Sequence, residues 1–203
     1  MPGVKNAEQT RQAILAAAFN EIHENGFQGA RLDRLLPELG LTKGALYYHF
    51  PDKQSVLSAV IDEMLDPTQQ IMWSQPLRES DDPIEGLKVS IRGMKEKHLE
   101  RDENIERGCP VFNLIQEMSP IHEGVRQKLE QLVDSIRNST IEALERGIAA
   151  GIVREDVRPD VVADFIMATK EGIMNYGKLT RSRQQIEDSF RCLEEYLDTL
   201  RKT

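Results

Sequence analysis

The chain has 203 residues, 39% hydrophobic and 30% charged, which is enough for one large domain or two small ones with a sizeable core. Its formal net charge of -8 argues against a protein that coats nucleic acid over its whole surface, because phosphate repels an acidic body. Residues 1–53 hold six basic and six acidic side chains, so the acidic excess lies in the remainder of the chain.

Two cysteines, Cys109 and Cys192, are too few for a disulfide framework or a zinc site, and the four histidines are scattered. The opening MPGVKNAEQTRQA lacks the apolar segment of a signal peptide, and the longest apolar run, AILAAAF, is far too short to cross a membrane. We therefore expect a cytoplasmic protein with no membrane partner, no metal and no cofactor.

Helical periodicity runs along almost the whole chain and no strand alternation is convincing, which predicts an all-α fold of about nine helices. The first helix is expected over residues 7–25, where Ile14, Ala18 and Ile22 share a face. Gly26 is suited to end it, since glycine readily adopts the conformation that terminates helices.

Three shorter helical segments follow. One is expected over residues 31–38, broken by Gly40, and the next over residues 43–49, which the Phe50-Pro51 pair stops because proline disfavours helical geometry in the residue before it. Asp52 can cap the fourth helix.

After the weak breaker Asp66-Pro67 the helical pattern resumes through Trp73, and residues 75–83 have the composition of a loop. Further helices are expected over residues 84–105, 108–119, 120–150, 159–178 and 182–201, with a connector over 151–160.

Two short helices joined by ELGLT fit a helix-turn-helix, whose second helix can lie in the major groove of DNA. That helix would expose Lys43, Tyr47 and His49, while Leu46 and Phe50 anchor its other side. The bare pattern fits an ordinary three-helix core with a solvated polar face as well. Tyr47 and Tyr48, however, are consecutive and diverge around a helix, so both cannot be central core.

The small residues Gly44 and Ala45 would let the backbone of this helix approach DNA closely. Lys53 begins the fourth helix, where its charge and the free backbone N–H groups favour a phosphate.

The stretch LTKGALYYHFPDK, with Gly26-Phe27 and the G-L-T-K-G of residues 40–44, resembles the recognition segment of the TetR family of bacterial transcriptional regulators. The likeness covers about residues 8–60. It implies an all-α homodimer with two heads for double-stranded operator DNA and a body that responds to a small-molecule effector, most often as a repressor. The head would be residues 1–53, linked by a helix over 52–65 to a body over 66–203.

The resemblance implies a set of DNA-contacting positions: Arg31, Thr42, Lys43, Gly44, Ala45, Tyr47, Tyr48, His49 and Lys53. Three departures from the family pattern matter. Ala30 and Arg31 stand where hydroxyl residues are usual, so the charge of Arg31 would replace a phosphate contact. Ala45 loses a donor but can touch a thymine methyl. Pro37 removes one backbone bond, so the second helix should be short or kinked.

The body should hold an effector pocket between helices. Candidate lining residues are Trp73, Met94, Cys109, Phe112, Met118 and Phe165. Plain core packing is the simpler explanation of each of them, because aromatic and methionine side chains fill helical cores routinely.

Cys109 lies at the expected start of a helix, between Gly108 and Pro110, and follows Arg107. A helix N-terminus and a nearby cation lower the pKa of a thiol, so Cys109 could sense electrophiles. The resemblance to the TetR family also implies this, since some members of one subgroup respond to reactive compounds. Alternatively Cys109 is a small buried residue at a packed helix start, while Cys192 is expected in a core.

The last two helices carry apolar stripes that we assign to a dimer interface built as a four-helix bundle. These residues are Val162, Ile166, Ile173, Ile186, Phe190, Leu193, Leu197 and Leu200. Burial within a single chain is the competing explanation.

Two other functions are compatible with the sequence. A helical ligand-binding or interaction protein without DNA binding fits the acidic charge, although Lys43, Tyr47 and Lys53 oppose it. A cysteine-dependent enzyme using Cys109 has no base in sequence context, and no phosphate loop or metal spacing is present, so we expect no catalytic residue.

Overall fold

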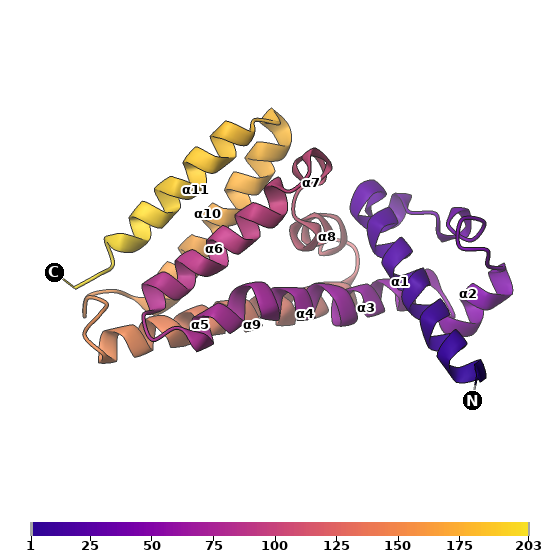
Figure 1. Cartoon of the computed structure of the whole chain (residues 1–203), viewed down its shortest axis with the longest axis horizontal. Coiled ribbons are helices and arrows are strands. Elements are labelled where there is room, and N and C mark those ends of the chain that lie inside the picture. The colour runs from indigo at the N-terminus through magenta and orange to yellow at the C-terminus, as the bar shows by residue number, and fades with distance from the viewer. Residues whose placement is uncertain (1, 203) are drawn as a thin grey trace. The chain divides into compact units, whose positions relative to one another are not determined.

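The computed structural model describes residues 2–202, with side chains for 7–202, and throughout that range the ordered elements are helices (Figure 1). The one pairing of extended backbone among these residues is an isolated bridge between Val153 and Arg201. The predicted all-α class is confirmed. No helix among the described residues is long and apolar enough to cross a membrane.

The chain forms two compact units, one of residues 1–67 and 113–129, the other of residues 68–112 and 130–203. The first holds α1 (Pro2–Gly29), η1 (Leu32–Arg34), α2 (Lys43–His49), α3 (Lys53–Val60) and η2 (Ile61–Leu65). The second holds η3 (Gln70–Ser74), α5 (Gln75–Glu79), α6 (Pro83–Leu99), α7 (Asp102–Arg107), α10 (Pro159–Thr180) and α11 (Arg183–Asp198). The helices α4 (Asp66–Gln69), α8 (Pro110–Met118) and α9 (Glu123–Ala149) have residues in both.

Segment 113–129, which the sequence placed in the body, groups with the N-terminal unit. Its polar side chains explain this: Glu117 accepts from the backbone of Phe27 at 2.7 Å, and Lys128 pairs with Asp62 at 2.6 Å. Hydrogen bonds across such sequence distances cannot be read from helical periodicity, which reports only which face of a segment is apolar.

Helix α1 buries Ile14, Leu15, Ala18 and Ile22 against the rest of the first unit. Gly26 has φ of 72°, a left-handed conformation that interrupts the helix where the sequence predicted its end. One further turn then continues to Gly29.

Two π-turns lie between α3 and α5, and the residue that follows each of them, Asp66 or Gln75, precedes a proline. The N–H of Asp66 bonds to the carbonyl of Ile61, and the N–H of Gln75 to that of Gln70. Proline lacks an N–H and crowds the carbonyl four residues back, so a wider turn accommodates Pro67 and Pro76 without ending the helix. The loop predicted over residues 75–83 is therefore limited to 80–82.

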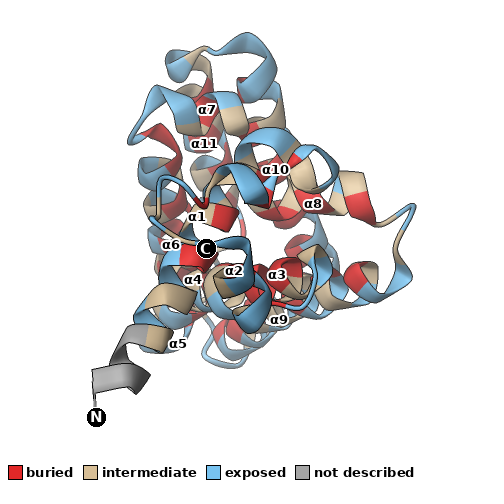
Figure 2. Cartoon of the chain, turned by 90° about the vertical axis from the view of Figure 1, so that its right-hand side faces the viewer, coloured by how far each residue is buried: buried red, intermediate tan, exposed pale blue. Residues whose placement is uncertain are grey.

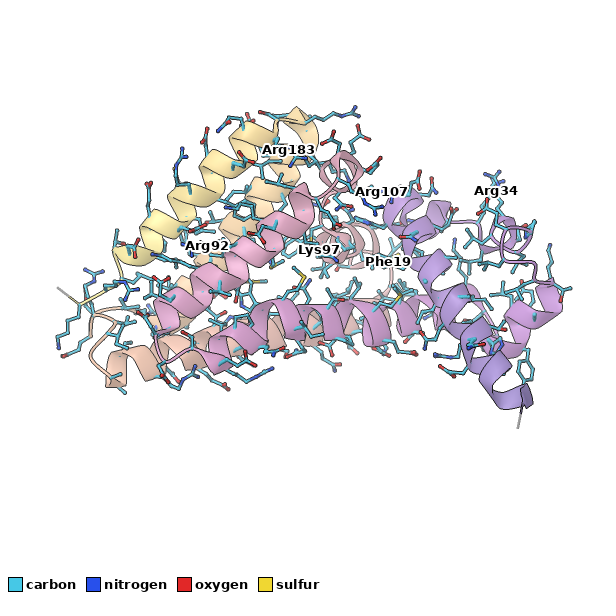
Figure 3. The ribbon with its side chains drawn as sticks, viewed as in Figure 1. Phe19, Arg34, Arg92, Lys97, Arg107 and Arg183 are labelled. Carbon is cyan, nitrogen blue, oxygen red and sulfur yellow. The ribbon has the colours of Figure 1, made fainter. Side chains whose placement is uncertain are left out.

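In the second unit α11 packs against both α10 and α6, and α10 also packs against α7 (Figure 1). The helix predicted over residues 84–105 divides into α6 and α7 around Glu100 and Arg101. Arg183, labelled in Figure 3, closes this break by donating to the Leu99 carbonyl at 2.6 Å and to Asp102 Oδ1 at 3.0 Å.

The predicted dimer stripe is wrong in its main part, because most of its residues are buried within one chain. Those buried are Val162, Ile166, Ile186, Phe190, Leu193, Leu197 and Leu200. Within one chain α10 packs on α11 and α7, and α11 packs on α6, so these buried residues have no surface left for a second chain. Only Ile173 is half-buried.

Arg201 joins the end of the chain to the start of α6. It bonds to Asp82 Oδ2 at 2.7 Å, Glu85 Oε1 at 3.0 Å and Asp198 Oδ1 at 3.4 Å, and Lys88 also bonds to Asp198. Partial burial opposes ionisation of Asp82, but hydrogen bonds from Arg201 and the backbone hold its pKa below the usual value. The hydrogen bond from Lys88 lowers the pKa of Asp198.

We expect Arg201→Ala to lower the free energy of unfolding by about 1 kcal/mol at pH 7, a small loss because water screens the cluster. Depressed carboxylate pKa values contribute stability above the unfolded value of about 3.9, and this contribution is lost as pH falls through the folded pKa. The deficit of the variant should therefore shrink at low pH. Urea unfolding at neutral and acidic pH measures it. Arg158→Ala, which removes an exposed pair with Asp160, is the control with no expected change. A pH-independent deficit would contradict the ionic origin.

Candidate functional site

Helix α2 is built as the sequence predicts. Thr42 caps it by accepting from the N–H of Ala45 at 3.3 Å, and Asp52 and Ser55 form a capping box at the start of α3. Leu46 and Phe50 are buried beneath the helix. The two ends and one face of this short helix are therefore fixed by specific contacts.

The opposite face of α2 carries predicted contact residues, and much of this helix is coloured as exposed in Figure 2. Tyr47 is 59% and Tyr48 80% exposed, which is unusual for tyrosines that serve no surface role. Thr42, Lys43 and Gly44 are exposed too, whereas Ala45 and His49 are half-buried. The ring of His49 meets that of Tyr48 edge-on, with centroids 5.1 Å apart.

A groove of about 280 Å³ within the first unit brings together the predicted residues Arg31, Lys43, Tyr47 and Lys53. Lys43 lies 4.0 Å from Asp33, an exposed and weak pair that leaves its ammonium available. The groove thus has cationic groups beside an aromatic hydroxyl, the donor types that bind phosphate oxygens.

Lys53 itself is directed elsewhere. Its ammonium donates to the carbonyls of Ala30 at 2.6 Å and Gln28 at 3.3 Å and lies 4.9 Å from the centre of the Phe27 ring. A cation is favoured at these carbonyls, which end α1. We therefore assign Lys53 to closing the end of α1, in place of the phosphate contact predicted from its helix position.

The second helix of the motif is reduced to the 3₁₀ turn η1 followed by turns over residues 35–40. Pro37 accounts for this, since it cannot donate to the backbone carbonyl four residues earlier. The prediction of a short second helix is confirmed. Arg31 is exposed, and its N–H donates to Glu21 at 2.9 Å.

Glu117 is a residue that sequence reasoning missed. Its two carboxylate oxygens accept from the N–H groups of Phe27 and Gln28, each at 2.7 Å. The left-handed φ of Gly26 favours glycine, and a Cβ there would stand 2.9 Å from Glu117 Oε2, so a larger residue would also have to displace this carboxylate. No local pattern marks Glu117, because its partners lie some ninety residues earlier.

In the second unit the predicted effector residues Trp73, Met94, Cys109 and Phe112 surround one buried lysine, Lys170. Its ammonium lies 5.1 Å from the centre of the Trp73 ring and 3.9 Å from Met94 Sδ, and Cys109 and Phe112 line the same small cavity as Lys170. The Trp73 N–H donates to Thr140 Oγ1 at 2.9 Å, which satisfies the expectation that a buried indole finds a partner.

The other two predicted effector residues lie elsewhere. Met118 is buried and belongs to the first unit, so it packs in a different core. Phe165 is 46% exposed on the outer face of α10, where its ring meets that of Tyr196 at a centroid distance of 4.8 Å. Helical periodicity could not separate these residues from those around Lys170.

Cys109 does not have the lowered pKa that its position before α8 suggested. Burial, followed by the nearby Glu171 carboxylate, raises the pKa of the thiol to about 12, and the opposing effect of Lys170 is smaller. The expectation for Cys192 is also wrong, because that residue is exposed. Among the described residues no group of three or more His, Cys, Asp or Glu side chains could hold a metal ion.

We expect Cys109 to be protected in the folded protein. In a Cys192→Ala variant, alkylation at neutral pH followed by mass spectrometry should be at least about a hundredfold slower in buffer than in concentrated urea, because both burial and the raised pKa remove thiolate. Equal alkylation rates in buffer and urea would show that Cys109 is accessible and reactive in the folded protein, as the sequence suggested.

Comparison with known proteins gives a consistent relationship. Residues 14–60 match the family model described as bacterial regulatory proteins of the tetR family, and residues 94–193 match the tetracyclin repressor-like C-terminal domain. An HTH-type transcriptional regulator in the lacX 3' region of Lactococcus lactis subsp. lactis is 28% identical, over 94% of this chain and 94% of that protein.

The HTH-type transcriptional repressor DhaR of Mycobacterium sp. (strain GP1) is 26% identical, over 92% of this chain and 91% of its own. A TetR transcriptional regulator from Chloroflexus aurantiacus J-10-FL has the same fold, with a TM-score of 0.86, 22% identity, and coverage of 97% of this chain and 98% of that one. With the capped, exposed helix α2 in its first unit and these matches in both, the chain belongs to the TetR family and is a transcriptional regulator.

Proposed function

We propose that this protein is a cytoplasmic, homodimeric repressor that binds a palindromic operator and leaves it when a small molecule enters the second unit. The observation that carries the proposal is the surface of α2, where Lys43, Tyr47 and Tyr48 face solvent above the buried anchors Leu46 and Phe50. A helix that is anchored by buried apolar residues on one face and exposes polar groups on the other is suited to bind in the major groove.

The outer face of α10 supports a dimer. Its exposed residues recur at helical spacing and are mostly apolar: Val161, Phe165, Ala168, Gly172, Tyr176 and Leu179. Such a stripe is costly to leave in water and is the kind of surface that a second copy covers. A two-fold dimer would place two α2 helices for two half-sites of matching symmetry.

Helix α8 offers a physical link between ligand and DNA. Its first turn includes Val111 and Phe112, which line the cavity beside Lys170 in the second unit. Its last turn carries Glu117, which holds the backbone of Phe27 and Gln28 in the first unit. Displacement of the first turn by a ligand would act along the helix on the end of α1. Coupling of this kind typically amounts to 1–3 kcal/mol.

We expect Lys43→Ala to weaken operator binding without unfolding the protein, and Tyr47→Phe to do the same through its lost hydroxyl. Losing one phosphate contact should flatten the dependence of log affinity on log salt by about 0.9. Fluorescence anisotropy with an operator fragment at several salt concentrations measures this.

The matched control is Lys97→Ala, which removes an exposed lysine from α6 in the second unit (Figure 3). Its affinity and salt slope should equal those of the wild type. If Lys43→Ala also behaves as wild type, α2 is not the DNA-reading helix. If the wild type shows no salt-dependent DNA binding at all, the protein is a helical ligand-binding protein without an operator.

We expect the double variant Phe165→Glu with Tyr176→Glu to be a folded monomer that no longer binds the operator. The charges would be solvated in one chain but buried without partners in the dimer. Analytical ultracentrifugation at micromolar concentration and circular dichroism measure the two properties. Val89→Glu, an equivalent change on the exposed side of α6, should stay dimeric. A dimeric double variant would show that the interface lies elsewhere.

A further inference from the structure

The small cavity beside Lys170 holds two hydrogen-bond acceptors that the protein leaves unpartnered. Glu171 Oε2 and Gln69 Oε1 are buried and have no hydrogen-bond partner within the described part of the chain, and the donor nearest to the Glu171 carboxylate besides Lys170 is the weak one of the Cys109 thiol. Glu171 is 3% and Gln69 7% exposed, and both line the same cavity of about 10 Å³. The two residues come from different helices, α10 and α4.

Unpartnered buried acceptors are costly. The cost is greater when the acceptor is charged, and folded proteins pair the large majority of such groups. The oxygens of Gln69 and Glu171 are therefore suited to accept hydrogen bonds from a donor group of a bound ligand.

The charge around these acceptors selects the kind of donor. The other oxygen of Glu171 pairs with Lys170 at 2.8 Å, and the side chains of both residues are almost wholly buried. The Lys170 ammonium also lies over the Trp73 ring. A ligand cation would place a second positive charge beside Lys170, whereas a neutral hydroxyl or amide N–H satisfies the acceptors without changing the net charge.

The rest of the lining is apolar, including Phe112, Ile136 and Met167. The cavity accommodates about one donor group, so the remainder of a ligand must displace side chains. Met167 is suited to move, since methionine is unbranched and has flexible torsions. Gln69 lies between the two π-turns, a helical irregularity that is frequent at binding sites.

We propose that the effector is a neutral small molecule whose hydroxyl or amide donor bonds to Glu171 and Gln69 and whose apolar part lies against Phe112, Ile136 and Met167. That the ligand acts as an effector rests on the proposed function. The binding of a donor by Glu171 and Gln69 does not depend on operator binding.

Three four-carbon probes separate the possibilities: 1-butanol carries a neutral donor, diethyl ether has no donor, and butylammonium is a cation. Trp73 is the single tryptophan, and its contact with Lys170 makes its fluorescence a direct readout. We expect 1-butanol to change this fluorescence saturably and with at least about tenfold higher affinity than the other two, as the loss of one hydrogen bond to a charged acceptor predicts.

Two variants test the acceptors. Gln69→Leu removes one, and Glu171→Leu with Lys170→Met removes the other while keeping the charge balanced. Each should lower the affinity for 1-butanol about tenfold and leave the weak binding of diethyl ether unchanged. Gln69→Glu adds a charge and should still bind the alcohol. Equal binding of the three probes, or unchanged alcohol affinity in Gln69→Leu, would overturn the donor site.

The same samples are titrated with the operator fragment. Alcohol binding at Trp73 together with weakened operator affinity supports both proposals. If the alcohol binds as expected but operator affinity is unchanged, the donor site stands and its role as the effector site is wrong. If the wild type does not bind the operator even without a ligand, the proposed function is wrong, while the binding of the alcohol can still be correct.

Discussion

The first unit depends on holding a seven-residue helix in place. Isolated helices shorter than about 12–15 residues are marginal in water, so α2 cannot supply its own stability. Thr42 satisfies its first turn, and Leu46 and Phe50 bury its underside. Because these contacts fix the helix from below, its outer residues are free to be polar and aromatic. The guanidinium of Arg11 over the Phe50 ring, with its ion pair to Glu63, extends the support to α1 and η2.

The second unit balances packing against a buried polar cluster. A lysine and a glutamate at adjacent positions of α10 are both nearly inaccessible to water, and such a pair is weak evidence for stability because desolvation offsets the attraction. Replacing them by apolar residues would simplify the core. Their presence beside Gln69, Trp73 and a small cavity is easier to explain by ligand recognition than by folding.

The two apolar faces of α10 show what an apolar sequence pattern can and cannot predict about burial. One face carries Val162 and Ile166, and the other carries Val161 and Phe165 one position away. Periodicity detects both, but it does not say which is covered by the same chain. The structure buries the first within the same chain, where α10 packs on α11 and α7, and leaves the second exposed. Of the two terminal helices, α11 has α6 to pack on, so the main apolar stripe is buried within one chain.

By itself the sequence determined the helical class, the bounds of α2, the caps at Thr42 and Asp52 and the shortened η1, because each follows from interactions within a few residues. Only the tertiary structure decided what depends on distant partners. It gave Lys53 to the carbonyls of Ala30 and Gln28, joined Glu117 to Phe27, and raised the pKa of Cys109 by burial beside Glu171. Burial and charge at a side chain are set by whatever packs around it, and helical spacing along one segment carries no record of those neighbours.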